Sequence, residues 1–379
     1  MSKRPHQEDP ELLPFWLPFF WPLAATAAAS EIAKRLLAGT TTNTAKIQTK
    51  TYRSDEQWAT PNQVILDLPT MRLRCFSTQG YGTPTLLCAP YAMHGATIAD
   101  FAPRHSLVEG LRGSGLSRVC VTDWRSATPE MRYFSIDTYL AELNVAIDEL
   151  GPPVNLIGLC QGGWMALLYA ARFPEKVRRL CLAGAPVDIG AARSYISGTA
   201  ENTPIAVFEE LVSLGGGRVL GDRVLQYWTP VLATDQIDRI LQIDLDGENG
   251  NLRELESRFA EWNATTVDLP GTYFLEVVRL LFKDNAIARG RFVALGRQID
   301  LKNVRCPLYL LAARDDELVA VEQLLATARI VGTPRTAIQT ATEPCSHLAL
   351  FLGQKTLSRG WGRIGRWLQE DDATLALAS

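Results

Sequence analysis

The sequence predicts an α/β fold built on a mostly parallel sheet, and the alternation of strand and helix patterns supports this. Short apolar segments predict strands at Thr85–Ala89, Arg118–Thr122, Val154–Gly158, Leu180–Gly184 and Leu308–Ala312. Helical patterns occur between several of them, notably at Ile136–Leu150 and Gly163–Phe173. Continuous apolar strands separated by helices are typical of a parallel sheet that is covered on both faces.

Composition indicates an ordinary globular protein and excludes some classes. The 379 residues are 47% hydrophobic and 21% charged, and the net charge of −3 comes without a long basic run, so we expect no nucleic-acid partner. The seven cysteines are odd in number and include no C-x-x-C pair, which argues against a disulfide framework and a metal site. We therefore expect four of them to be small buried hydrophobic residues in a reducing compartment: Cys88, Cys120, Cys181 and Cys306.

The chain divides into three regions by pattern. Residues 1–59 form an N-terminal aromatic arm with a short helix at Ser30–Ala38. Residues 60–188 and 300–379 contain the alternating pattern of the α/β core. Between them the alternation stops, and residues 189–299 are mostly helical and aromatic, which predicts a helical cap inserted between two strands of the sheet.

The uncharged stretch at residues 12–29 raises the question of a membrane segment. Three prolines interrupt it and three acidic residues stand just before it, which is unlike a signal peptide. We expect an aromatic arm that packs on the protein, on a partner or on an apolar surface. The alternative is a membrane anchor or an export signal.

The segment from Val154 to Gly163 is a strand, a G-x-C-x-G turn and the start of a helix. This is the pattern of a nucleophile elbow, in which a strained strand-to-helix turn exposes the central residue, here Cys160. Glycines are needed at the flanking positions because side chains there collide with neighbouring backbone. The amide of Gln161 starts the helix, where it can stabilise an oxyanion. No lysine follows the glycines, which excludes a phosphate-binding P-loop. The elbow predicts an α/β-hydrolase fold.

The partners of this nucleophile follow in the order acid, then histidine. His347 is the only histidine after Cys160. The acid is expected in the loop after the strand at Leu308–Ala312, where Asp316 is favoured because it precedes an apolar pair by two residues, and Asp315 is the alternative. A second oxyanion donor is expected in the loop after the first core strand, and we interpret His94 as lining that loop.

Several stretches make the chain resemble the poly(3-hydroxyalkanoate) synthases, especially the short ones that work with a partner subunit. These stretches are Asp123-Trp124-Arg125, VNLIGLCQGGW around Cys160, Ala185-Pro186-Val187-Asp188, WNATTVDLPGTYFLEVVRLLFKDNAIARG from Trp262, and Gln298-Ile299-Asp300-Leu301 before Cys306-Pro307. The resemblance runs from about Thr60 to the C-terminus, and the Trp262–Gly290 stretch is its most discriminating part. The chain differs from the family pattern at Glu317, at Cys345-Ser346 and at Trp164.

The resemblance implies an acyltransferase that polymerises (R)-3-hydroxyacyl-CoA into polyhydroxyalkanoate with release of CoA. It implies Cys160 as the acyl carrier, His347 as its base, Asp316 as the supporting acid and the amide of Met93 as the second oxyanion donor. The CoA thioester is the substrate, and no cofactor is expected. The implied partners are a synthase subunit or a second copy of the chain, and the surface of a polyester granule in the cytoplasm.

Two alternatives remain open at this level. One is a hydrolase on the same scaffold, either an intracellular polyester depolymerase or an acyl-CoA thioesterase, which would use the same three side chains and admit water. The other is a non-catalytic homologue that coats granules through its N-terminal arm. The Trp262–Gly290 stretch argues against the first, and the intact set of Cys160, Asp316 and His347 argues against the second.

Overall fold

The computed structural model describes residues 50–51, 58–76, 81–223, 237–243 and 252–370. The chain divides into two compact units, Met1–Thr44 and Ala45–Ser379, and all described residues belong to the second. The predicted helix at 30–38 and the aromatic stretch at 12–29 lie outside the described residues.

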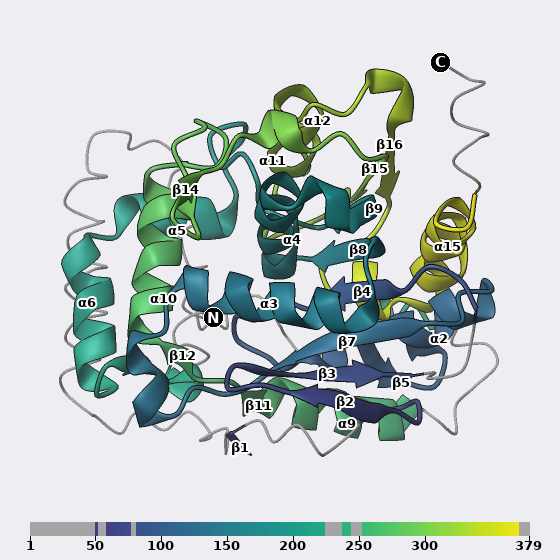
Figure 1. Cartoon of the computed structure of the whole chain (residues 1–379). Coiled ribbons are helices and arrows are strands. Elements are labelled where there is room, and N and C mark those ends of the chain that lie inside the picture. Colours follow the sequence, from purple (N-terminus) through teal and green to yellow (C-terminus); the bar gives the residue numbers. More distant parts are fainter. Residues whose placement is uncertain (1–49, 52–57, 77–80, 224–236, 244–251, 371–379) are drawn as a thin grey trace, which may run out of the picture. The chain divides into compact units, whose positions relative to one another are not determined.

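An eight-stranded sheet forms the centre of this unit, with the strand order β16-β15-β9-β8-β4-β7-β3-β2 (Figure 1). Six strands are parallel, whereas β3 pairs antiparallel with β7 and β2 pairs antiparallel with β3. The strands are β2 (Gln63–Asp67), β3 (Met71–Cys75), β4 (Thr85–Cys88), β7 (Val119–Trp124), β8 (Val154–Leu159), β9 (Val177–Ala183), β15 (Leu308–Ala313) and β16 (Ile338–Glu343). The predicted α/β-hydrolase fold with a mostly parallel sheet is confirmed.

The five strands predicted from the sequence are five adjacent members of this sheet. The three that the prediction lacks lie toward its two edges. Two of them, β2 and β3, precede the region where the alternating pattern begins. The third, β16, is half exposed and has polar residues at four of its six positions, so it lacks the continuous apolar run that marked the others.

Helices cover the sheet, and the main ones begin and end close to their predicted limits. Helix α3 spans Ile136–Leu150, and its buried residues recur at a spacing of three to four, so one stripe faces the core. Helix α4 spans Gln161–Arg172 and packs on β8 and β9, whereas α2 (Leu107–Gly113) contacts β7 and α15. Figure 1 shows α3 and α4 lying over the same face of the sheet.

The predicted C-terminal helix is broken into shorter pieces before it ends at Trp367. They are α13 (Ala349–Leu352), α14 (Gln354–Thr356), the π-helix η9 (Leu357–Trp361) and α15 (Gly362–Trp367). The first break falls at Gly353, whose extended backbone ends α13. Two short helices, α11 (Val321–Leu325) and α12 (Thr327–Ile330), follow β15.

Residues 189–299 lie between β9 and β15 and, in their described part, add no strand to the eight-stranded sheet. Their helices are α5 (Tyr195–Asn202), α6 (Ile205–Leu214), α8 (Ile237–Leu241), α9 (Leu252–Ala264), α10 (Gly271–Glu276) and the π-helix η6 (Val277–Lys283). The segment also contains two pairs of two-residue strands, β10 (Arg218–Val219) with β12 (Leu269–Pro270) and β13 (Val293–Ala294) with β14 (Arg297–Gln298). A further short strand of the segment, β11 (Thr265–Thr266), pairs with β1 (Lys50–Thr51). The division into arm, core and cap stays a prediction.

One cysteine prediction is wrong. Cys120 was expected to be a free buried thiol, but it forms a disulfide with Cys75. The two residues stand directly opposite each other in the antiparallel β3–β7 pair, a register that spacing along the chain does not reveal. Cys88 and Cys181 are free and buried, and Cys306 is free and partly buried.

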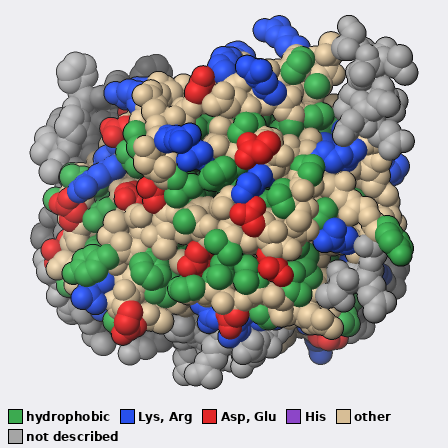
Figure 2. Space-filling view, in the orientation of Figure 1, with side chains coloured by type: hydrophobic (Ala, Val, Ile, Leu, Met, Phe, Trp, Pro, Cys, Tyr) green, Lys and Arg blue, Asp and Glu red, His purple; other side chains and the backbone are tan. Residues whose placement is uncertain are grey.

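Charges of both signs are interspersed on the face seen in Figure 2, without a continuous field of one sign. Among the described residues, no group of His, Cys, Asp or Glu side chains is arranged to hold a metal ion. Within that same part of the chain, no helix combines the length and the apolar character needed to span a membrane.

Candidate active site

Cys160 lies at the sharp turn between β8 and α4. Its backbone has a φ of +48° and a ψ of −118°, a conformation that residues other than glycine rarely adopt. The Cys160 amide donates to the carbonyl of Ala183 in β9 over 2.9 Å, which ties the turn to the neighbouring strand. The side chain is partly exposed, in contrast to the buried free thiols of the core. The turn thus presents a sulfur atom at the carboxyl edge of the sheet.

The two glycines of the elbow are required by close backbone contacts. A Cβ atom on Gly162 would lie 2.1 Å from the carbonyl oxygen of Cys88 in β4. A Cβ on Gly158 would lie 2.4 Å from the Cα of Gly163 and 2.8 Å from the carbonyl oxygen of Gly162. Contacts this short do not occur in folded proteins, so helix α4 can approach β4 and β8 only because these side chains are missing.

His347 and Asp316 meet Cys160 at this edge of the sheet. Nδ1 of His347 lies 2.7 Å from Oδ2 of Asp316, and both side chains are almost fully buried. The other carboxylate oxygen accepts hydrogen bonds from the amides of Leu318 (2.9 Å) and Val319 (2.8 Å), which fixes its orientation. Asp315, the alternative acid, is exposed and pairs with Arg314 instead. The structure therefore brings Asp316, and not Asp315, to the histidine.

His347 is hydrogen-bonded to Cys160 as well as to Asp316, and both contacts affect its charge. Burial by itself lowers the pKa of His347. The Asp316 carboxylate and the Cys160 sulfur act in the opposite direction and outweigh it, so the pKa of His347 lies well above its ordinary value of 6.5. The raised pKa favours the imidazolium form of His347 beside the Asp316 carboxylate, in contact with the sulfur of Cys160.

The two predicted oxyanion residues line the same cavity as Cys160. Gln161 is the first residue of α4, so its amide has no acceptor within the helix, and its side-chain oxygen accepts a 2.6 Å hydrogen bond from the indole of Trp164. Trp164, one of the residues that differ from the family pattern, is buried and orients the Gln161 side chain. Met93 lies in the loop after β4 and lines the same cavity as Cys160 and Gln161.

The stretch that begins at Trp262 supports the loop that carries Met93. The amide of Val267 donates to the Met93 carbonyl over 3.0 Å, which holds the peptide group between Met93 and His94. The ring of His94 stacks on Trp262 with centroids 4.3 Å apart, and its Nδ1 lies 3.1 Å from the carbonyl oxygen of Thr265. Burial, opposed by the hydrogen bond to Thr265, lowers the pKa of His94 to about 4, so this imidazole is neutral near pH 7. As predicted, His94 lines the loop.

A mostly apolar cavity of about 200 Å³ opens at Cys160 and His347. Its walls come from the core loop at Met93 and from residues 189–299, and they include Phe208, Leu211, Val219, Phe274, Val277 and Phe282. The segment inserted between β9 and β15 therefore covers the thiol with apolar side chains. Such a cavity fits an acyl chain and offers little to hold water.

Glu317 and Thr265 contribute to the site, although sequence analysis assigned them no role. A carboxylate oxygen of Glu317 accepts a 3.3 Å hydrogen bond from the amide of His347, so this residue helps to hold the histidine loop. Its position next to Asp316 was a signal that could have identified it. Thr265 contacts His94 through its backbone carbonyl, a contact that the residue type at position 265 does not predict.

The elbow, the buried histidine–aspartate pair and the covered cavity together form the candidate active site on an α/β-hydrolase scaffold. The sequence matches the family described as alpha/beta hydrolase fold over residues 109–354, and the chain belongs to this family. The Bacillus megaterium epoxide hydrolase has the same fold, with a TM-score of 0.52, 15% identity, and coverage of 80% of this chain and 99% of that one.

Within the family, the chain is similar to poly(3-hydroxyalkanoate) polymerase subunits named PhaC. The subunit from Allochromatium vinosum is 26% identical over 284 residues, which cover 72% of this chain and 77% of that protein. The subunit from Thiocystis violacea is 26% identical over 329 residues, covering 82% of this chain and 88% of that protein. The resemblance predicted from the sequence motifs is confirmed.

Proposed function

We propose that the protein is an acyltransferase that polymerises (R)-3-hydroxyacyl-CoA into a polyester and releases CoA. The observation that carries the proposal is the combination of the polymerase-like sequence with a cysteine, His347 and Asp316 under an apolar cover. In this proposal Cys160 is the nucleophile, His347 transfers protons, and Asp316 orients and charges the histidine. The amides of Met93 and Gln161 stabilise the oxyanion.

The first half-reaction loads the acyl group onto the enzyme. The Cys160 thiolate attacks the thioester carbonyl carbon, and the negative charge on oxygen is received by the two amides. The bond between that carbon and the CoA sulfur then breaks. The leaving sulfur takes the proton carried by His347, so CoA departs as a thiol and the imidazole becomes neutral. Exchange between two thioesters keeps the acyl group activated.

The second half-reaction forms the ester bond. Neutral His347 accepts the proton of the 3-hydroxyl group of another hydroxyacyl unit while its oxygen attacks the carbonyl of the Cys160 thioester. The bond from carbon to the Cys160 sulfur breaks, and the thiolate and imidazolium are restored. Asp316 holds the proton-bearing Nδ1 throughout, which leaves the other ring nitrogen for both transfers.

Exclusion of water decides between polymer and free acid, because water can attack the same thioester. We propose that residues 189–299 act as a cap for this purpose. The apolar side chains around the cavity support this role, since they offer few partners to an ordered water molecule. The proposal therefore favours transfer to a hydroxyl group over hydrolysis.

The experiment that tests the function measures thiol release from (R)-3-hydroxybutyryl-CoA by the purified protein, with analysis of the acyl product. We expect CoA release together with polymer, and complete loss of both in Cys160→Ala. Cys306→Ala is the matched control because it removes another partly buried free thiol and should retain the activity. Free 3-hydroxybutyrate in place of polymer would assign the chain to the thioesterases or depolymerases. Release that persists in Cys160→Ala would refute the mechanism.

We further propose that the protein works with a partner synthase subunit or as a homodimer at the surface of a cytoplasmic polyester granule. The names of the two relatives describe them as polymerase subunits, which supports a subunit partner. Deletion of residues 1–29 tests the role of the arm. Granule association should be lost while the enzyme stays folded, and unchanged association would contradict the role.

A further inference from the structure

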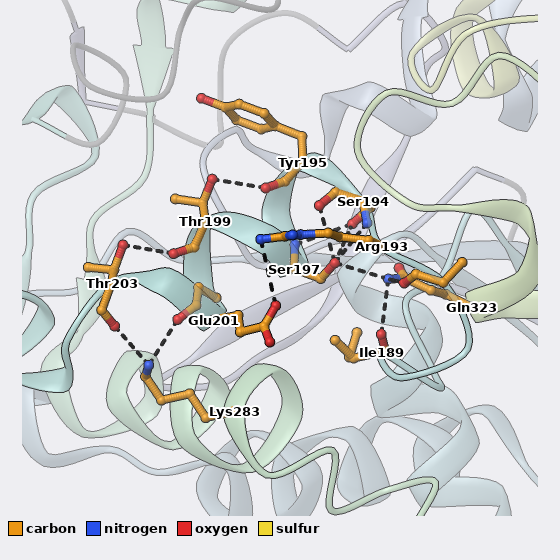
Figure 3. Close-up of polar contacts among 12 residues, drawn as sticks. Ile189, Arg193, Ser194, Tyr195, Ser197, Thr199, Glu201, Thr203, Lys283 and Gln323 are labelled. Atoms are coloured by element: carbon orange, nitrogen blue, oxygen red, sulfur yellow. Dashed lines mark hydrogen bonds and ion pairs between the residues drawn. The ribbon is translucent and has the colours of Figure 1, made fainter. Parts of the chain in front are cut away.

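A second cavity, of about 320 Å³, lies beside helix α5 and is polar where the active-site cavity is apolar. Three segments form it. They are the loop from Ile189 to Arg193, one face of α5, and the end of η6 with the turn that runs to Arg289. Figure 3 shows part of this region, including Arg193, Glu201 and Lys283, with their polar contacts. The proposed mechanism uses none of them.

Three cations line this cavity, against one carboxylate. Arg193 approaches Glu201 only to 3.8 Å, and both side chains are more than half exposed, so the contact holds the guanidinium weakly. Arg289 is exposed, and its side chain makes no hydrogen bond or ion pair within the described part of the chain. The net positive charge stands out in a protein whose total charge is −3. Both guanidinium groups therefore have donors available for an anion.

The third cation, Lys283, is held in place. Its ammonium group donates hydrogen bonds to the carbonyls of Ala200 (2.9 Å) and Thr203 (2.8 Å) at the C-terminal end of α5. Figure 3 shows this side chain rising from its helix to those two carbonyls. A positive charge at this end is favourable for the helix. Because an ammonium group has three donors, one of them remains after these two contacts.

The wall of the cavity is built by buried polar contacts. Gln323 is fully buried, and its amide nitrogen donates to the Ala192 carbonyl over 2.7 Å and to the Ser197 hydroxyl over 3.3 Å. The carbonyl oxygen of the Asn285 side chain accepts from the amide of Ile189 over 3.1 Å. These contacts fix the loop before Arg193 against α5 and α11. The cavity is thus formed by an ordered frame.

A missing side chain in α5 sets the position of Arg193. A Cβ atom on Gly198 would lie 2.9 Å from Nε of Arg193. The arginine therefore lies close against the helix, and Figure 3 shows it reaching toward Glu201 along α5. This brings its guanidinium to the same side as the cavity.

The polar cavity and the active-site cavity are neighbours. Phe282 lines both of them. Helix α5 faces both as well, since Ile196 and Ala200 line the apolar cavity, whereas Ser197 and Glu201 line the polar one. One helix and one aromatic ring therefore separate a reactive thiol in an apolar chamber from a cluster of cations. This arrangement fits a ligand with an apolar acyl end and a highly anionic carrier end.

We propose that the cavity lined by Arg193, Lys283 and Arg289 binds the phosphate groups of the nucleotide end of the acyl-CoA substrate. The proposal rests on the proposed function, because it takes a CoA thioester as the acyl donor at Cys160. Charge-assisted hydrogen bonds from the two arginines supply the attraction, and the fixed ammonium adds to the field. The proposal places the acyl group in the apolar cavity at Cys160, on the other side of Phe282.

The test compares two thioesters of the same acyl group in Arg193→Ala/Arg289→Ala. One is (R)-3-hydroxybutyryl-CoA and the other is the N-acetylcysteamine thioester, which lacks every phosphate. We expect KM for the CoA thioester to rise roughly tenfold or more, the loss typical of charge-assisted hydrogen bonds. KM for the truncated thioester should change less than twofold. Arg335→Ala, which removes an exposed arginine elsewhere, should change neither. Equal KM changes for the two thioesters, or none, would overturn the proposal.

A binding measurement separates this proposal from the proposed function. Free CoA is titrated calorimetrically into Cys160→Ala protein with and without the two arginine substitutions. CoA should bind more weakly to the protein with the two arginine substitutions, and high salt should weaken binding in the same way when both arginines are present. These two results would support the site even if no polymer is formed. Equal affinity in both proteins, or no binding in either, overturns the site even if the enzyme is active. A thermal melt confirms folding, and Arg289→Gln replaces the double variant if it unfolds.

Discussion

The contact between Asp316 and His347 makes the catalytic proposal sensitive to a single atom. In Asp316→Asn the side-chain oxygen can keep the two hydrogen bonds from the amides of Leu318 and Val319. The new NH₂ group then faces Nδ1 of His347 over the 2.7 Å now spanned by the ion pair. Because NH₂ only donates, Nδ1 must become an acceptor and the ring proton must move to the other nitrogen. That nitrogen then cannot accept a proton from a thiol or hydroxyl.

The magnitude follows from this change of tautomer. The same substitution in a serine–histidine–aspartate triad lowers kcat by about 10⁴. A cysteine is intrinsically more nucleophilic than a serine, so we expect a loss of about 10³ to 10⁴, or about 4 to 5 kcal/mol of transition-state stabilisation. Removal of the carboxylate also leaves burial as the dominant influence on the imidazole, so the pKa of His347 should fall in the variant.

The assay is CoA release under saturating (R)-3-hydroxybutyryl-CoA, followed across pH. Asp315→Asn is the matched control, since it removes a neighbouring carboxylate that is exposed and does not contact the histidine. The control should keep its rate within about twofold, as is usual for exposed surface positions. A near-normal rate in Asp316→Asn, or a comparable loss in Asp315→Asn, would refute the assignment of the acid.

Three further outcomes are expected. Gly162→Ala should lower the free energy of unfolding by about 3 kcal/mol or prevent folding, because its Cβ would lie 2.1 Å from the Cys88 carbonyl; a denaturant melt checks this. Burial lowers the pKa of His94 to about 4 in the folded protein, from 6.5 in the unfolded chain. The folded state therefore loses about 3 kcal/mol of stability as pH falls from 6.5 to 4. His94→Gln should remove that loss, and denaturant melts at about pH 7 and pH 4 check this. Trp164→Phe should free the Gln161 side chain and lower kcat roughly threefold to tenfold with KM little changed, since one neutral hydrogen bond is lost; an equal rise in KM would contradict this.

Much of the fold was predictable because its signals are local. A strand buried on both faces contains a continuous apolar run, and β4, β7, β8, β9 and β15 each contain such a run. The edge strand β16 is half exposed, so its sequence resembles a loop. The disulfide between Cys75 and Cys120 depends on the register of two strands 45 residues apart, which no local pattern encodes.

In the candidate site, too, some residues could be predicted from local patterns and others depend on tertiary contacts. Cys160 and His347 could be identified because the elbow is a contiguous motif and only one histidine follows it. The choice of Asp316 over Asp315 depends on which carboxylate turns inward at the loop after β15. The structure decides this through two backbone amides and the contact with His347.

The sequence by itself determined the fold class, the elbow and the order of the three candidate catalytic residues, because each of these depends on neighbours in the chain. Only the tertiary structure decided what surrounds them. The support of Met93 by Val267, the apolar cover over the thiol and the cluster of cations beyond Phe282 join segments far apart in the sequence. Their positions follow from packing and hydrogen bonding in three dimensions, and these leave no trace in the spacing of residues along the chain.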